Sequence, residues 1–433
     1  MKINHPRESG QILIVLAVAL IGMLGLTALA VDGGMIYADR RFSQSASDTA
    51  SLVGAGAAAQ YMEANGVLWT NFTCSKSEVV AAFSAAFNSA KNAAANNQFQ
   101  DLDNVLSDKH GIEITCVDDP DHFEKYLDVH TMITSNVSTS FIHLFYKGPV
   151  KNTVNSVVRI HPRTEQGFGH AIVGLNDTCG SSDGGVLFDG SNGVLINGGG
   201  VFSNSCIKGA GTVDVNVTNG GIEYVGELDM SGNPILQPDP EKKPVEMPNL
   251  AVQVPNCGSE PPVASQGGGD IYPGNYSRIK LSNGALTLHP GLYCVSGEFA
   301  AEGGTVNGDG VTIYMLKDGT HDTSLTINGN VEVHLNTARD NPAEGGAITG
   351  VLIYMADGNQ GDISLEGTSV SSFAGEIYAP DGTIDIGGTS GVNPTYNTQL
   401  IGKYVKIHGT ADIDINYTGY VPYTTTPKLD MME

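Results

Sequence analysis

The second half of the chain repeats short apolar phrases that each begin with glycine. "GVTIYM" at 310–315 returns as "GVLIYM" at 350–355, and a looser echo, "GEIYAP", follows at 375–380. Further runs of this kind occur between 185 and 419 and are closed by Gly, Asn or Asp. A recurring short unit indicates stacked copies of one supersecondary structure. The repeats therefore predict an all-β body made of short strands and tight turns.

Short strands in coils of about 20–25 residues are typical of a solenoid, in which alternate side chains stack in a narrow core. We expect residues 166–420 to form a right-handed parallel β-helix, with two coils between the phrases at 310 and 350. Tyr314, Tyr354 and Tyr378 are then expected to stack as a ladder on one face. A β-sandwich has a similar strand spacing and is the alternative.

A proline-rich stretch interrupts the repeats at residues 233–262, "NPILQPDPEKKPVEMPNLAVQVPNCGSEPP". Proline has no backbone N–H to give to a strand ladder, so we expect a long excursion from one coil. A linker between two separate β domains is the alternative. Residues 421–433 are expected to be a frayed tail.

Residues 12–31, "ILIVLAVALIGMLGLTALAV", form a run of twenty residues without a charge. At 1.5 Å per residue such a helix crosses a bilayer core of about 30 Å. We therefore expect a transmembrane helix that contacts lipid over 12–31, with residues 1–11 in the cytoplasm. Ala28-Leu29-Ala30 also matches a signal-peptidase site, so a cleaved signal peptide is the alternative.

The helical pattern continues beyond the apolar run, which favours a retained anchor. Small and apolar residues recur at spacings of three and four without an intervening proline, and Asp39, Arg40 and Arg41 fall between them. We expect one helix to leave the membrane and extend over residues 32–60. A cleaved leader would not need this extension.

The segment 61–165 has the pattern of a small α+β domain. Apolar residues share one face over 76–97, which predicts a second helix. The stretches 111–117, 126–145 and 153–161 alternate or run apolar as strands do. A helix followed by a small sheet, carried on a membrane helix, is a pilin-like arrangement.

The side of the membrane on which the bulk lies is decided by composition. Lys2 and Arg7 precede the apolar run and Arg40 and Arg41 follow it, so the positive-inside rule gives little guidance. The cysteines and the balance of 46 acidic against 22 basic residues favour an extracytoplasmic bulk. The net charge of -24 excludes nucleic acid as a partner.

Six cysteines are spread along the chain without a CxxC pair, which argues against a zinc site. An even number in an exported chain fits disulfides, although several connectivities are possible. We expect neighbours to pair: Cys74 with Cys116, Cys179 with Cys206, and Cys257 with Cys294. Six buried thiols are the alternative.

No motif in the sequence indicates catalysis, a cofactor or a metal. Asp118 and Asp119 are paired acids, but they lie outside the repeats. Arg278 and Lys280 are expected to be solvated charges on a strand. The stretch 302–311, "EGGTVNGDGV", only half matches a calcium-binding nonapeptide. We therefore expect no enzyme, no cofactor and no metal site; a β-helical carbohydrate-active enzyme is the least favoured reading.

Residues 8–55, "ESGQILIVLAVALIGMLGLTALAVDGGMIYADRRFSQSASDTASLVGA", resemble the N-terminal segment of TadG-like and TadE-like proteins of the Flp (Tad) pilus system. The shared features are Gly10 and Gln11 before the apolar run, "AVDGGMIY" with Asp32 and Tyr37 at its end, and a helix that carries Arg40 and Arg41. True prepilins have Glu five residues after the cleaved glycine, where this chain has Val15. The repeats also resemble the β-helical region of TadG-like proteins.

The resemblance implies a non-enzymatic, single-pass protein of the bacterial cytoplasmic membrane, with its bulk at the cell surface or in the periplasm. It implies an α+β pilin-like module on a transmembrane helix, followed by the β-helix. Gly22 and Gly25 could let the anchor pack closely on a partner helix, and small residues that face lipid are the alternative. The expected partners are other Flp/Tad pilus or envelope components. An adhesin that binds surface glycans through the β-helix is the alternative.

Overall fold

The computed structural model of the chain divides into two compact units. The first comprises Met1–Asp118, Lys125–Arg163 and Pro427–Glu433, and the second comprises Asp119–Glu124 and Thr164–Thr426. The structure describes residues 11–103, 106, 109–144, 146–180, 184–317, 319, 321–339, 343–366, 368, 370–388, 395–419 and 422–432.

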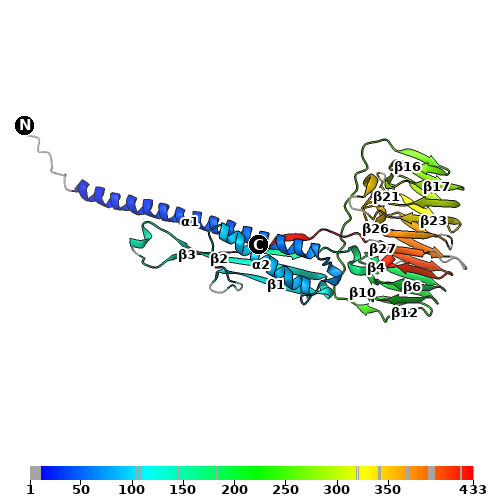
Figure 1. Cartoon of the computed structure of the whole chain (residues 1–433), viewed down its shortest axis with the longest axis horizontal. Coiled ribbons are helices and arrows are strands. Elements are labelled where there is room, and N and C mark those ends of the chain that lie inside the picture. Colours follow the sequence, from blue (N-terminus) through cyan, green and yellow to red (C-terminus); the bar gives the residue numbers. More distant parts are fainter. Residues whose placement is uncertain are drawn as a thin grey trace, which may run out of the picture. The chain divides into compact units, whose positions relative to one another are not determined.

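Two helices and a four-stranded sheet form the first unit (Figure 1). The helices are α1 (Gln11–Ala64) and α2 (Ser77–Asn96). The strands, in sheet order, are β1 (Gly111–Asp119), β2 (Glu124–Val137), β3 (Val150–His161) and β29 (Lys428–Met432). The two helices and the first three strands confirm the α+β pattern, although β2 ends earlier than expected and a short helix, η4 (Ile142–Leu144), follows it.

Alanine and glycine allow α1 to lie close to α2 and the sheet. Ala46, Ala50 and Ala58 of α1 are fully buried in one apolar core with alanines of α2. A Cβ at Gly54 would lie 2.9 Å from the Ala86 carbonyl oxygen and 2.9 Å from the Ala90 Cβ. Side chains this small allow the two helix axes to approach closely, and the contact leaves no space for a larger side chain at Gly54.

The last strand corrects the prediction of a frayed tail at 421–433. β29 pairs antiparallel with β3, with Leu429 opposite Ile160 and Met431 opposite Val158. The open edge of β3 offers unpaired backbone N–H and C=O groups, and a returning strand satisfies them.

The second unit is a mostly parallel β body, a 25-stranded sheet within the described residues. Its strands are β4 (His170–Gly174), β5 (Val186–Gly190), β6 (Gly193–Asn197), β7 (Gly200–Ser203), β8 (Ile207–Gly211), β9 (Asp214–Thr218), β10 (Ile222–Tyr224), β11 (Leu228–Met230), β12 (Ile235–Gln237), β13 (Glu241–Lys242), β14 (Val263–Gln266), β15 (Gly269–Ile271), β16 (Gly274–Leu281), β17 (Ala285–Leu288), β18 (Gly291–Val295), β19 (Glu298–Ala301), β20 (Gly304–Gly308), β21 (Val311–Met315), β22 (Ser324–Ile327), β23 (Val331–Asn336), β24 (Val351–Met355), β25 (Asp362–Leu365), β26 (Ser372–Gly388), β27 (Thr395–Gly409) and β28 (Ile413–Asn416).

Most of these strands pair in parallel with the strand three positions further along the chain. β4 pairs with β7, β5 with β8, and β6 with β9, and the same interval joins β18 to β21 and β21 to β24. Matching residues then stack: Ile313 faces Ile353, which faces Ile377, and all three are fully buried. Each repeat therefore buries its apolar residues against the corresponding ones of its neighbour.

The two "IYM" phrases lie in adjacent strands, so the interval between them is one repeat and the expectation of two is wrong. Tyr314 pairs directly with Tyr354, and Tyr354 with Tyr378. The connection from β23 to β24 spans residues 337–350, which lengthens this repeat. The predicted tyrosine ladder is present, with ring centroids 4.9 Å and 5.3 Å apart.

The order of pairing differs from the order of the sequence, because the chain enters the β body in its middle. β4 and β5 pair with β27, and β6 pairs with β28, so the first strands of the body lie beside the last ones. Pairing then runs to β11, β12 and β13 at one end and to β14 and β15 at the other; Figure 1 shows β12 and β16 towards these opposite ends. The connection from β13 to β14 therefore joins the two ends.

The proline-rich stretch is thus neither an excursion from one coil nor a linker between two domains. It contains β12 and β13, which pair with β9 and β10, so the expectation that it supplies no ladder hydrogen bonds is wrong. β12, Ile235–Gln237, contains no proline, since Pro234 and Pro238 lie directly outside it, and so it can pair along its whole length. The remaining residues, 243–262, are called the strap below.

The strap runs along the face that carries the tyrosine ladder. Met247 exchanges two hydrogen bonds with the Asn204 side chain, of 2.7 and 3.1 Å. The Tyr378 hydroxyl donates to Asn249 Oδ1 at 3.0 Å, and the Tyr354 hydroxyl donates to the Val252 carbonyl at 3.4 Å. The ladder is therefore covered by the chain itself.

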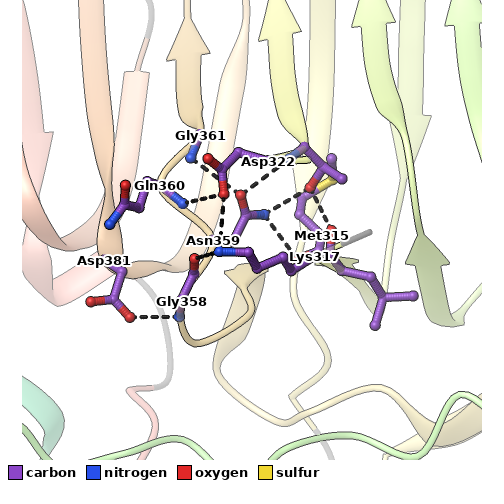
Figure 2. A network of polar contacts seen from close by, with 10 residues as sticks. Met315, Lys317, Asp322, Gly358, Asn359, Gln360, Gly361 and Asp381 are labelled. Carbon is purple, nitrogen blue, oxygen red and sulfur yellow. Dashed lines mark hydrogen bonds and ion pairs between the residues drawn. The ribbon is translucent and has the colours of Figure 1, made fainter. Parts of the chain in front are cut away.

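A buried asparagine holds the turn between β24 and β25 (Figure 2). Asn359 Nδ2 donates to Thr323 Oγ1 at 2.7 Å, and Asn359 Oδ1 accepts from the backbone N–H of Thr323 and Gly361. Lys317 donates to the Gly358 carbonyl beside it. One amide side chain thus replaces backbone pairing where the strands are interrupted.

Candidate functional site

The N-terminal part of α1 exposes a continuous apolar surface. Leu13, Leu26 and Leu29 are each at least 70 % exposed, and no described atom lies within 4 Å of a Cβ built at Gly22 or Gly25. The helix is long and apolar enough to cross a membrane. Because leaving this many apolar side chains in water is unfavourable, we expect lipid or another helix to cover the surface.

Asp32 marks the point where α1 changes from exposed to packed. Its carboxylate accepts hydrogen bonds from the backbone N–H groups of Ser140 at 2.7 Å, Phe141 at 3.0 Å and Ile142 at 2.5 Å. Burial raises the pKa of Asp32, but these three donors outweigh burial and hold its pKa below the ordinary value. The side chain is therefore ionised at neutral pH and ties the β2–β3 connection to α1.

A second carboxylate repeats this arrangement two turns further along the helix. Asp39 accepts hydrogen bonds from the Ser135 hydroxyl and from Asn152 Nδ2, the latter at 2.8 Å. Asn152 Nδ2 also donates to the Ile36 carbonyl at 3.1 Å. β2 and β3 are thus both fastened to one helical position.

Serine side chains continue the attachment towards the end of α1. Ser47 donates to the Thr131 carbonyl at 2.8 Å, and Ser51 donates to the Ser156 carbonyl at 3.0 Å. Both serines are fully buried, and they lie four residues apart on one face of the helix. The second half of α1 is therefore part of the domain core, whereas the first half projects from it.

The structure places the predicted N-terminal residues unevenly. Gly10 lies outside the described residues, and Gln11 begins α1. Tyr37, Arg40 and Arg41 are exposed on the helix surface. Asp32 alone of the predicted set makes tertiary hydrogen bonds that the structure describes. Sequence reasoning missed Asn152, Ser47 and Ser51, because each of these side chains bonds to an element that lies far away in the sequence.

The structure contains the three predicted disulfides: Cys74–Cys116, Cys179–Cys206 and Cys257–Cys294. The first closes the α+β unit, the second lies in the β body, and the third fastens the strap to β18. No cysteine is free.

The other candidate residues take part in ordinary ion pairs. Arg278 lies 3.6 Å from Glu298, and Lys280 lies 2.7 Å from Glu302; of these residues of the β body Glu302 is exposed and the other three are half-buried. Asp118 pairs with Lys125 at 3.4 Å, and Asp119 with His122 at 2.8 Å. Among the described residues, no group of three His, Cys, Asp or Glu side chains could hold a metal ion.

Comparison with known proteins assigns the N-terminal segment. Residues 10–59 match the family described as Tad, putative Flp pilus-assembly TadE/G-like. No curated protein matches the chain, and neither does any solved structure. The match covers the exposed part of α1 and most of its packed part, and it does not reach the β body. The chain thus carries, over residues 10–59, the TadE/G-like segment of the Flp pilus-assembly family.

Proposed function

We propose that the protein is a membrane-anchored component of the Flp/Tad pilus system that acts in pilus assembly or envelope attachment and has no enzymatic activity. The single observation that carries the proposal is the coincidence of the TadE/G-like match with a helix whose first half is exposed and apolar and whose second half is packed. A helix of this kind joins a membrane to a folded domain.

In this proposal residues 12–31 cross the cytoplasmic membrane once, and the bulk of the chain lies outside the cytoplasm. The three disulfides support an oxidising location. Gly22 and Gly25 lie nine and six residues before Val31, the last residue of the apolar run, and leave room for a partner helix. The partners are other pilus or envelope components.

The β body is proposed to be a right-handed parallel β-helix that this anchor displays. Parallel pairing at an interval of three strands and stacking of identical residues support that architecture. Adhesion through the tyrosine face is less favoured than assembly, because the strap occupies that face. If the protein were an adhesin, the polar depression lined by Asp309, Asn336 and Arg339 would be the surface that binds a glycan.

The proposal is tested in native cells by replacing both anchor glycines, Gly22→Leu and Gly25→Leu, and measuring piliation and cross-linking to other membrane components. We expect the protein to remain in the membrane fraction while cross-linking and piliation are lost. Val18→Leu is the matched control on the same helix. Release of the unaltered protein into the medium, shortened at Ala28-Leu29-Ala30, would contradict a retained anchor.

A further inference from the structure

We infer that the tip of the β2–β3 hairpin, residues 138–144 and 146–148, lies in the membrane interface and makes a second contact with lipid. This inference rests on the proposed function, because it takes residues 12–31 to be the membrane span. It adds a contact outside the helix and a class of partner for that contact, the headgroup region of the bilayer.

Asp32 fixes the position of the hairpin tip along α1. Asp32 directly follows Val31, the last residue of the apolar run, and binds the backbone N–H groups of Ser140, Phe141 and Ile142. The Ser140 hydroxyl also reaches Met35 Sδ at 3.9 Å, one turn further along the helix. The tip therefore lies beside the point where α1 leaves the hydrocarbon.

The charge of Asp32 sets the depth of this point. An ionised carboxylate is costly within the hydrocarbon, and the three backbone donors keep Asp32 ionised. The same three N–H groups are satisfied by the carboxylate, so this turn of the hairpin can approach the bilayer without unpaired donors at those positions. The Asp32 carboxylate and the three N–H groups that it binds therefore suit the boundary between the lipid headgroups and the solvent.

The side chains of the tip have the chemistry of an interfacial surface. Phe141 is 42 % exposed and Tyr146 is 53 % exposed, and Tyr37 of α1 is 64 % exposed within two turns of Asp32. Aromatic rings of this kind concentrate at membrane interfaces, where one part of the ring is apolar and another is hydrated. Lys147 is also exposed and can approach anionic headgroups.

Lipid is favoured over a protein partner because the aromatic tip is continuous with the apolar surface of the span. The exposed apolar residues of α1 run without interruption to Val31, and Met35 continues them to the level of Ser140. A bilayer that surrounds the helix must therefore reach the tip, whereas a protein partner would require a separate surface to do so.

The test uses the full-length protein in vesicles of phosphatidylethanolamine and phosphatidylglycerol, with tryptophan introduced at single positions and lipids brominated at defined depths as quenchers. The emission of Trp69, which every variant also contains, is recorded with the unaltered protein and subtracted. Phe141→Trp should lose emission to lipids brominated near the glycerol. Val80→Trp, at an exposed position of α2, is the matched control and should keep its emission. Leu20→Trp, within the span, should lose emission to lipids brominated near the chain ends.

The three variants separate the failure of this inference from the failure of the proposed function. If Leu20→Trp keeps its emission, the span is not in the membrane and both fail. If Leu20→Trp is quenched and Phe141→Trp behaves as Val80→Trp does, only the hairpin contact is overturned. A blue-shifted emission at 141 without lipid quenching would place the tip against protein and would also overturn it. Adding Asp32→Ala should weaken the quenching at 141, because the tip loses its attachment to α1.

Discussion

At the scale of single residues, Glu376 is the clearest departure from ordinary burial. This residue of β26 is fully buried, and neither carboxyl oxygen has a hydrogen-bond partner among the described residues. Burial raises the pKa of Glu376 well above its ordinary value of 4.5. The folded protein therefore holds the carboxyl protonated at pH values at which the unfolded chain has released the proton.

Glu376→Gln should raise the free energy of unfolding at neutral pH. Above the ordinary pKa the carboxyl of the unfolded chain is ionised, whereas that of the folded protein keeps its proton. The free energy of unfolding therefore falls as the pH rises, up to the pH that equals the folded-state pKa. Each unit of difference is worth about 1.4 kcal/mol. Thermal melts from pH 4 to 8, in detergent, should show a gain that grows with pH and vanishes at the acid end; an equal gain at all pH values would contradict the assignment. Glu298→Gln, in the half-buried ion pair with Arg278, is the control.

Five glycines form a column along one edge of the β body, and Gly409 shows why. Its φ is +126°, and a Cβ there would lie 2.2 Å from the Gly388 carbonyl oxygen. Gly388, Gly409, Gly190 and Gly211 face one another in successive strands, and Gly232 would meet the Gly211 carbonyl in the same way. The column passes without a break from the last strands of the body to the first.

Gly409→Ala should destabilise the β body, because alanine is strained at this φ and collides with the next strand. We expect a loss of about 1–3 kcal/mol, measured as the shift in the denaturation midpoint of β-sheet circular dichroism. Gly180→Ala has no described atom within 4 Å of the new Cβ and should leave the midpoint unchanged. Equal midpoints for both variants would show that the column tolerates a side chain.

At the scale of elements, Gly54 sets the distance between α1, α2 and β2. A side chain there would meet Ala86, Ala90 and the Val129 Cγ1 atom, which lies 3.2 Å from the built Cβ. Gly54→Leu should destabilise the α+β unit by about 1–3 kcal/mol through overpacking. Gly56→Leu is on the same helix with open space around it and is the matched control.

The single tryptophan of the chain makes this measurement specific. Trp69 belongs to the α+β unit and is 8 % exposed, so its emission follows the unfolding of that unit alone. Gly54→Leu should move the tryptophan transition to lower denaturant and leave the β-sheet signal of the β body in place. An unchanged tryptophan transition would contradict the packing argument.

The elements that the sequence predicted are those set by local pattern. The apolar run of α1, the face of α2 and the alternation in β1 and β3 are visible in short windows, because each depends on its own periodicity. The disulfides followed from neighbour spacing. Other features depend on partners more than twenty residues away, which no short window contains. These are the hydrogen bonds of Asp32, the pairing of β29 with β3 and the position of β12.

At the scale of the whole molecule, the order of strands in the β body is that of a continuous stack whose ends are joined by the strap. The last strands of the body pair directly with the first ones: β27 with β4 and β5, and β28 with β6. Entry and exit therefore lie together, and Glu165 pairs with Thr424 where the chain arrives and leaves. This proximity explains how β29 can return to β3, since the chain leaves the body where it entered.

The strap is therefore expected to be dispensable for holding the two halves of the β body together. A specific protease site inserted between Val254 and Cys257 would cut the strap, and no disulfide crosses this point, because Cys257 pairs forward with Cys294. The chain is shortened to end at residue 426, so that pairing of β29 with β3 cannot join the fragments. After cleavage in detergent, the fragments should elute together in gel filtration without a denaturant, because β27 and β28 remain paired with β4, β5 and β6. Two separate β domains joined by a linker would elute apart, and that result would overturn the pairing order.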